Sequence, residues 1–170
     1  MSSELTTDEL ASGAIISPCG HYRYHLWRIW EPTLPVCVWV MLNPSTADEH
    51  ADDPTIRKCI AIARHNGFGG ISVRNVFAYR ATDKTELLKV SDPVGPDNTE
   101  HLLAARSVSV LTRLVLGWGK PFGGDKLAPH FRNAEVILRT LSPYCIKQNK
   151  DGSPIHPLYQ KNESKMVLFV

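Results

Sequence analysis

The sequence lacks any apolar run close to the ~20 residues that a membrane-spanning helix needs. Its first ten residues, MSSELTTDEL, are polar and acidic, which is unlike a signal or transit peptide. It also lacks G-x-G-x-x-G after a strand, the phosphate-loop lysine motif and H-E-x-x-H. These absences argue against a membrane protein, a nucleotide-cofactor enzyme and a zinc protease. We expect a cytoplasmic protein that uses no cofactor and no metal.

Cysteine is scarce, and no two cysteines form a C-x-x-C pair. Of the four, Cys37 and Cys59 lie in apolar periodic segments, which predicts small core residues rather than metal ligands. The net charge of +2 and the pI near 8.4 are mildly basic. Such a charge permits a nucleic-acid partner and does not require one.

The composition is that of a globular chain, with 43% hydrophobic and 21% charged residues in a length of 170. This length predicts a single domain over residues 1–170. Within it, residues 1–12 are expected to form a short helical turn or a flexible segment. Residues 13–35 alternate polar and apolar side chains around a Pro-Cys-Gly turn and predict a β-hairpin. Residues 36–160 then form the α/β core.

The strongest single feature is the apolar run from Val36 to Leu42, which predicts a strand buried on both faces. It ends at an Asn-Pro-Ser-Thr segment, where proline ends the regular backbone and polar groups gather. In open α/β sheets, ligands bind at the carboxyl ends of such strands. The four carboxylates that follow are Asp48, Glu49, Asp52 and Asp53. The segment therefore predicts an active site, or else a polar loop that caps the next helix.

Three more strand-and-helix units follow the same pattern. Further strands are expected over residues 71–78, 111–116 and 144–146, and helices over 53–64, 82–90, 97–108 and 126–141. Asp53 followed by proline predicts a helix N-cap. Because parallel strands need crossover helices, the pattern predicts a three-layer α/β/α sandwich. Its central, mostly parallel sheet is expected to have four strands, with the N-terminal β-hairpin ahead of it.

Three polar or aromatic residues lie near predicted strand ends and have both a structural and a functional interpretation. Asn75 is unusual within a strand, because a buried amide needs hydrogen-bond partners or a ligand. Trp118 lies between two glycines and would either stack on a planar ligand or pack in the core. His156 lies between two prolines, either as a structural residue or as one held rigidly for chemistry.

Several ordered motifs resemble a bacterial and phage family, the domain of unknown function 1643. They are MLNPSTAD, DDPTIRKC, RNVFAYRATD, DPVGPDN, WGK and HPLY, and together they extend from about Cys19 to Tyr159. The family name implies no function.

A more distant resemblance is to the uracil-DNA glycosylase superfamily. That superfamily has G-x-[DN]-P after its first strand, Asn at its second, L-G after its third and H-P-S after its fourth. The matching elements here, in the same order, are Leu42-Asn43-Pro44-Ser45, Asn75, Leu116-Gly117 and His156-Pro157-Leu158. Two positions depart from the pattern, since Met41 replaces the usual glycine and Leu158 replaces serine. The iron–sulfur cysteine spacing of some members is absent. The resemblance implies a uracil-DNA-glycosylase-like fold.

The resemblance also implies roles for individual residues. Asn43 would position the attacking water, Asn75 would read the edge of the base, and His156 would donate a hydrogen bond to the base oxygen as negative charge builds there. A carboxylate from the acidic loop would stabilise the positive charge that develops on the sugar. This role is our own interpretation and is not implied by the resemblance. The remaining candidates fall in three sets: Asp48, Asp52 and Asp53 for that carboxylate; Phe77, Tyr79 and Trp118 for stacking on the base; Ser45, Thr46 and Arg80 for contacts with DNA phosphates.

The expected function is therefore that of a DNA glycosylase-like enzyme, which hydrolyses the N-glycosidic bond of a flipped-out base. The pocket elements differ from those of uracil enzymes, and a phage-linked family favours a modified base and a role in antiviral defence. The expected partner is DNA, or else a small nucleobase or nucleoside, and the chain is expected to be a monomer. Two alternatives stay open: a hydrolase of free nucleosides or nucleotides, and a non-catalytic DNA-binding module on the same fold.

Overall fold

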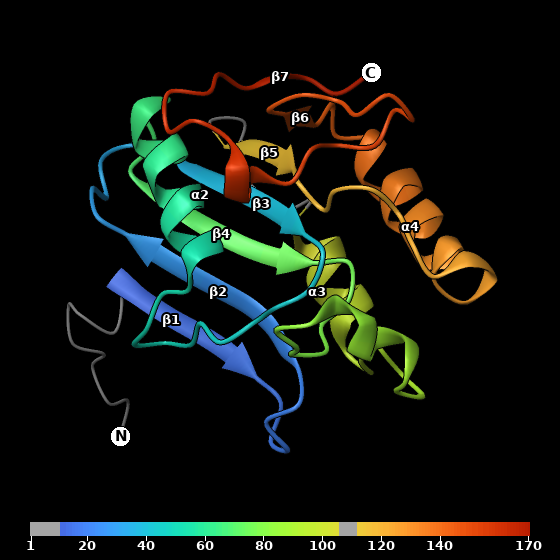
Figure 1. Ribbon diagram of the computed structural model, residues 1–170. Coiled ribbons are helices and arrows are strands. Elements are labelled where there is room, and N and C mark those ends of the chain that lie inside the picture. Colours follow the sequence, from blue (N-terminus) through green and yellow to red (C-terminus); the bar gives the residue numbers. More distant parts are fainter. Residues whose placement is uncertain (1–10, 106–111) are drawn as a thin grey trace.

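A seven-stranded mixed sheet runs through the computed structural model, which describes residues 11–105 and 112–170 (Figure 1). The strand order is β1-β2-β4-β3-β5-β6-β7. In chain order the strands are β1 (Ser12–Ile16), β2 (Arg23–Ile29), β3 (Val36–Met41), β4 (Gly70–Asn75), β5 (Arg113–Leu116), β6 (Tyr144–Cys145) and β7 (Val167–Leu168). The pairs β4–β3, β3–β5 and β5–β6 are parallel, and the pairs β1–β2, β2–β4 and β6–β7 are antiparallel.

Strand β3 lies at the centre of this sheet, between β4 and β5. Its side chains are apolar on both faces because helices cover both (Figure 1). Cys37 and Trp39 pack toward α2 (Pro54–His65), whereas Val38 and Val40 pack toward α3 (Asn98–Ala104) and α4 (Gly124–Arg139). The prediction of a strand buried on both faces is confirmed.

Helix α2 begins where the sequence predicts. Asp53 is its N-cap and accepts a hydrogen bond from the backbone N–H of Ile56 at 2.9 Å, while Pro54 fills the first helical position. Its apolar side presents Ile56, Cys59 and Ile62 to the sheet. Cys37 and Cys59 are both fully buried, so their predicted place in the core is also confirmed.

The α/β class is confirmed, but the predicted sheet of four strands is too small. The N-terminal hairpin does not precede the sheet, because β2 pairs directly with β4 and extends it. Strand β7 was not predicted: both its residues are exposed, so it has no buried pattern for sequence analysis to detect. The segment predicted as a helix at 82–90 forms a 3₁₀-helix, η1 (Lys84–Leu88), capped by Asp83.

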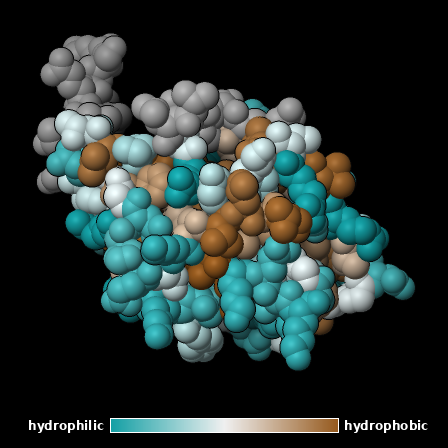
Figure 2. All heavy atoms as spheres, turned by 90° about the horizontal axis from the view of Figure 1, so that it is seen from above, coloured by the Kyte–Doolittle hydropathy of each residue, from teal (hydrophilic) through white to brown (hydrophobic). Residues whose placement is uncertain are grey.

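Part of the sequence-based prediction falls outside the described residues, namely the helical turn before residue 11 and the chain from 106 to 111. Of the helices in the described part, none has the length and apolar character that crossing a membrane requires. Across residues 11–105 and 112–170 no group of three or more His, Cys, Asp or Glu side chains is placed to hold a metal ion. Figure 2 views the molecule from the β7 side, where exposed apolar residues lie on a largely hydrophilic surface; they include Val167, Leu168 and Val170.

Candidate functional site

A small cavity of about 40 Å³ lies at the carboxyl ends of the parallel strands β3 and β4. Its lining comes from segments far apart in the chain: Arg23, Met41, Asn43, Ser45, Asp53, Thr55, Ile56, Val73, Asn75 and His156. Five of the predicted functional residues, Asn43, Ser45, Asp53, Asn75 and His156, therefore lie around one cavity. A single water molecule occupies about 30 Å³ of liquid, so a nucleobase needs more room than the cavity has in this conformation.

The amide of Asn43 has a defined orientation. Its Nδ2 donates to the carbonyl of Ala81 at 2.9 Å and to that of Pro44 at 3.0 Å. Because these acceptors take the nitrogen, the amide oxygen Oδ1 is the atom that remains for a ligand at the cavity. The loop after β3 therefore offers a fixed acceptor there.

The amide of Asn75 lies at the end of β4, opposite Met41 in the parallel register, and is 1% exposed. Its Nδ2 has no hydrogen-bond partner within residues 11–105 and 112–170. A buried donor without a partner lowers the stability of the fold by about 1–3 kcal/mol. Such groups are found at functional sites, where a ligand can satisfy them.

A second asparagine holds this strand end in place. Asn98, at the start of α3, is fully buried, and its Nδ2 donates to the carbonyls of Asn75 and Val76, both at 3.0 Å. The Asn98 side chain therefore connects the start of α3 to the end of β4.

This bridge predicts a loss of stability in the Asn98→Ala variant. Removing both hydrogen bonds leaves two strand-end carbonyls without this donor, so we expect the free energy of unfolding to fall by about 1–3 kcal/mol. Urea unfolding followed by circular dichroism measures it. Asp97→Ala is the matched control, because the Asp97 side chain makes no capping hydrogen bond, and its unfolding midpoint is expected to stay near that of the natural chain. Equal midpoints for the two variants would contradict the bridge.

The imidazole of His156 is held by the turn that follows it. His156 caps the 3₁₀-helix η3 (Pro157–Tyr159), and its Nδ1 accepts the backbone N–H of Leu158 at 3.3 Å. Burial lowers the pKa of His156, the positive charge of Lys84 lowers it further, and Asp53 opposes both. The ring is therefore neutral near pH 7 and carries its proton on Nε2, which makes that atom a donor.

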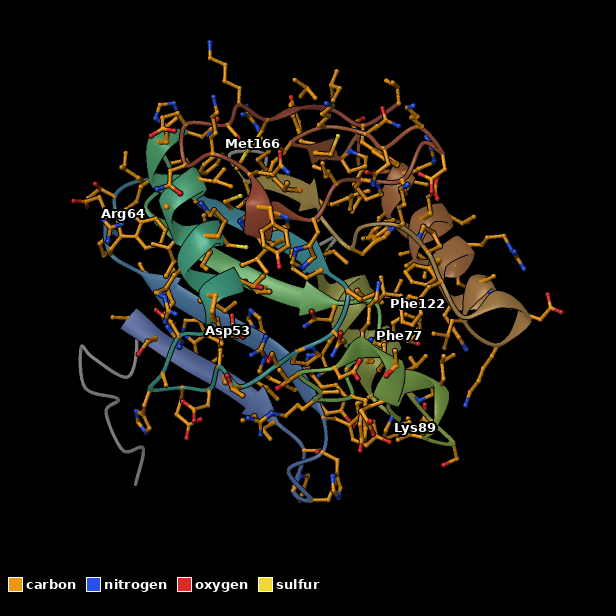
Figure 3. The ribbon with its side chains drawn as sticks, in the orientation of Figure 1. Asp53, Arg64, Phe77, Lys89, Phe122 and Met166 are labelled. Atoms are coloured by element: carbon orange, nitrogen blue, oxygen red, sulfur yellow. The ribbon has the colours of Figure 1, made fainter. Side chains whose placement is uncertain are left out.

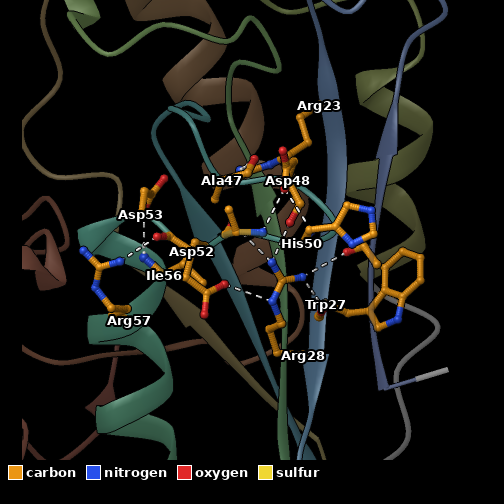
Figure 4. A network of polar contacts seen from close by, with 12 residues as sticks. Arg23, Trp27, Arg28, Ala47, Asp48, His50, Asp52, Asp53, Ile56 and Arg57 are labelled. Atoms are coloured by element: carbon orange, nitrogen blue, oxygen red, sulfur yellow. Dashed lines mark hydrogen bonds and ion pairs between the residues drawn. The ribbon is translucent and has the colours of Figure 1, made fainter. Parts of the chain in front are cut away.

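Among the carboxylates of the acidic loop, Asp53 alone lines the cavity, and it is 6% exposed. Asp48 instead accepts the backbone N–H groups of His50 and Ala51, which lower its pKa (Figure 4). Asp52 forms an ion pair with Arg28 at 2.9 Å. The structure therefore separates three aspartates that the sequence left equivalent.

Arg28 fixes the loop that carries these acids. Its Nη2 donates to the carbonyl of Asp48 at 2.5 Å, in addition to the ion pair with Asp52 (Figure 4). The Arg28 side chain extends from β2 to this loop and holds its backbone in place. The loop ends at Asp53, the N-cap of α2, so the position of Asp53 is fixed as well.

The predicted phosphate contacts lie together next to the cavity. Ser45, Thr46 and Arg80 line one open concavity of about 320 Å³, which His21 and Thr82 complete. Ser45 also lines the cavity itself, so the two spaces adjoin.

The predicted stacking residues do not reach the cavity. Phe77 is fully buried and packs edge-on against Phe131 of α4, and Trp118 belongs to the same core cluster. Figure 3 shows Asp53 at the start of α2 and Phe77 beyond the end of β4. The third, Tyr79, stacks on His21 at 6.3 Å between ring centroids. All three rings already pack against the protein, so their positions give no support to stacking on a base.

Sequence analysis missed Arg23, which lines the cavity from β2 and is 2% exposed. Its Nη1 donates to the carbonyl of Ala47 at 2.7 Å, whereas its Nε has no partner in the described part of the chain. Burial lowers the pKa of Arg23 to about 10, although Asp53 acts to raise it. The strand that carries Arg23 also contains Arg28 and His25, so its sequence does not mark Arg23 as buried, and we had assigned this segment to the N-terminal β-hairpin.

The cavity thus combines acceptors and donors. Asn43 Oδ1 and the carboxylate of Asp53 accept hydrogen bonds, while His156, Asn75 and Arg23 carry N–H groups. Two acceptors can hold a water molecule by its hydrogens, so that a lone pair of its oxygen stays available for attack. Several donors close together can stabilise a group that gains negative charge.

A family model described as "Protein of unknown function (DUF1643)" matches residues 23–158. Neither the curated proteins nor the solved structures contain a significant match.

Proposed function

The chain belongs to the DUF1643 family, and from the geometry of its cavity we propose that it is a DNA glycosylase-like hydrolase. The observation that carries this proposal is the convergence of Asn43, Asn75, Asp53 and His156 on one cavity. These residues come from four separate segments, at the edge of the sheet where α/β proteins bind ligands.

In the proposed reaction, water attacks the anomeric carbon of a flipped-out nucleotide. Asn43 Oδ1 and the Asp53 carboxylate hold this water by its two hydrogens, and Asp53 takes one proton as attack proceeds. The same carboxylate stabilises the positive charge that develops on the sugar. A volume of about 40 Å³ suits this water site.

The base lies on the donor side of the proposed site. Asn75 reads its edge, and His156 donates from Nε2 to an oxygen on which charge builds as the bond breaks. Entry of a base requires the cavity to widen. The N–H groups of Asn75 and Arg23 that have no partner among the described residues favour that change, because a ligand that enters can supply acceptors to them.

The adjoining concavity suits the sugar–phosphate backbone. Ser45, Thr46 and Arg80 offer two hydroxyls and a guanidinium, which are frequent partners of phosphate oxygens. We propose a uracil-DNA-glycosylase-like fold, because the four motifs follow one another along the chain in the same order as in that superfamily. The proposed substrate is a modified base in DNA, with a role in antiviral defence.

A base-release assay tests the proposal directly. The purified chain is incubated with single- and double-stranded DNA that contains uracil, modified bases or only ordinary bases, and abasic sites are cleaved by alkali and counted. We expect release from at least one modified DNA. Folded protein that releases nothing from any DNA would overturn the proposal, and release from free nucleosides alone would assign the chain to nucleoside hydrolysis.

The Asn43→Ala variant separates an enzyme from a binding module. Loss of the water-positioning acceptor is expected to lower base release by about 10²–10³-fold. Because Asn43 does not line the phosphate concavity, DNA affinity at fixed salt is expected to change less than threefold. Single-turnover kinetics and a filter-binding titration measure the two quantities. Unchanged release by a folded variant would remove Asn43 from the mechanism.

A further inference from the structure

Of the described residues that line the cavity, Arg23 is the only lysine or arginine. Its charge is poorly compensated: among the described residues no carboxylate oxygen lies within 4.0 Å of its guanidinium. One hydrogen bond, from Nη1 to Ala47, is all that its side chain makes to the described residues.

A buried cation of this kind is costly, since desolvation disfavours the charged form and an apolar side chain of similar volume is often more stable. The lowered pKa of Arg23 has burial as its main cause, yet at about 10 it still leaves the group charged near pH 7. The hydrogen bond to the Ala47 carbonyl gives Nη1 a structural role. It does not account for Nε, which is buried and has no hydrogen-bond partner among the described residues.

Building on the proposed function, we infer that Arg23 is a further catalytic residue, which stabilises the departing base as its anion. The bond between the anomeric carbon and the base nitrogen breaks, and its electron pair goes to the base. The water oxygen bonds to the anomeric carbon and its proton passes to Asp53. The base anion lies against Arg23 and the N–H of His156 until solvent protonates it. Arg23 thus supplies a full charge where His156 supplies a neutral hydrogen bond.

The test uses the acidity of the leaving base. For the base that the release assay identifies, the rate is compared with that of its ring-halogenated analogue, whose ring N–H is more acidic and which leaves more easily. Arg23→Met is expected to lower release of the parent base by about 10²–10³-fold. It is also expected to raise the rate ratio of halogenated to parent base by about tenfold, because a better leaving group needs the cation less. For Arg23→Lys, the release rate and the rate ratio are both expected to lie between those of the natural chain and those of Arg23→Met.

The rate ratio is measured within each variant, so partial unfolding of Arg23→Met does not affect it. Arg28→Met is the matched control: this arginine braces the acidic loop but does not line the cavity, so its ratio is expected to equal that of the natural chain. An unchanged ratio in Arg23→Met would overturn the role of Arg23 and leave the proposed function standing. Failure of the natural chain to release any base would overturn both.

Discussion

The Asp53→Asn variant is expected to lose base release by about 10²–10⁴-fold while it keeps its stability. An asparagine at this position still accepts the N–H of Ile56, because Asn is as good an N-cap as Asp. It has no negative charge, so it neither takes a proton from water nor stabilises the positive sugar. Single-turnover release and thermal unfolding measure the two effects. Asp53→Ala is expected to lose the cap as well, at a cost of about 1 kcal/mol.

Asp48→Asn is the matched control for this variant. The two aspartates lie five positions apart in one loop, but the Asp48 carboxylate accepts loop N–H groups and does not line the cavity. An asparagine oxygen can accept the same bonds, so release is expected to stay within about threefold of the natural chain. Equal losses in both variants would indicate that the loop's charge matters in general, and would remove Asp53 as the specific base.

The parts of the fold that the sequence predicts are those with a strong local signal. Val36–Met41 is apolar throughout because both of its faces are covered, and such a run is visible without any tertiary information. The N-cap at Asp53 likewise follows from two adjacent residues. The positions of Asn43 and His156 were predicted from the order of motifs along the chain, and the cavity brings both together.

The parts that sequence analysis misses depend on distant contacts. Arg23 lies in a segment that the sequence alone assigns to a surface hairpin. Its burial depends on the pairing of β2 with β4 and on the contact with the carbonyl of Ala47 in the loop after β3. Phe77 looks available for stacking because it follows a strand, yet α4 covers that side and fills it with Phe131. Side-chain packing of this kind has no local signature.

The second prediction with a large effect concerns stability in acid, through His25 on β2. Its Nε2 lies 2.7 Å from Ser72 Oγ, and Ser72 Oγ accepts a hydrogen bond from Arg74 Nη1, also at 2.7 Å. Because Arg74 can only donate, Ser72 keeps its own hydroxyl proton, which it can donate to Nε2 of a neutral His25. Burial lowers the pKa of His25 to about 3, and the charges of Arg74, His101 and Arg23 act in the same direction.

The sign of the effect follows from proton binding. A histidine in the unfolded chain, with a pKa near 6.5, gains its proton before the folded one does, so the unfolded state binds more protons between pH 6.5 and pH 3. The contribution of His25 to stability is fully present above pH 6.5 and is lost as the pH falls toward 3. At about 1.4 kcal/mol per pH unit over this range, the loss is on the order of 5 kcal/mol.

Urea unfolding at several pH values between 7 and 4 measures this loss, and His25→Gln identifies its source. Glutamine can still accept the Ser72 proton but does not titrate, so the variant's free energy of unfolding is expected to depend less on pH, by about one proton's slope. His65→Gln is the control, because His65 is exposed at the end of α2, and its profile is expected to follow that of the natural chain. Parallel profiles for His25→Gln and the natural chain would show that the neutral imidazole beside Arg74 is not what makes this fold sensitive to acid.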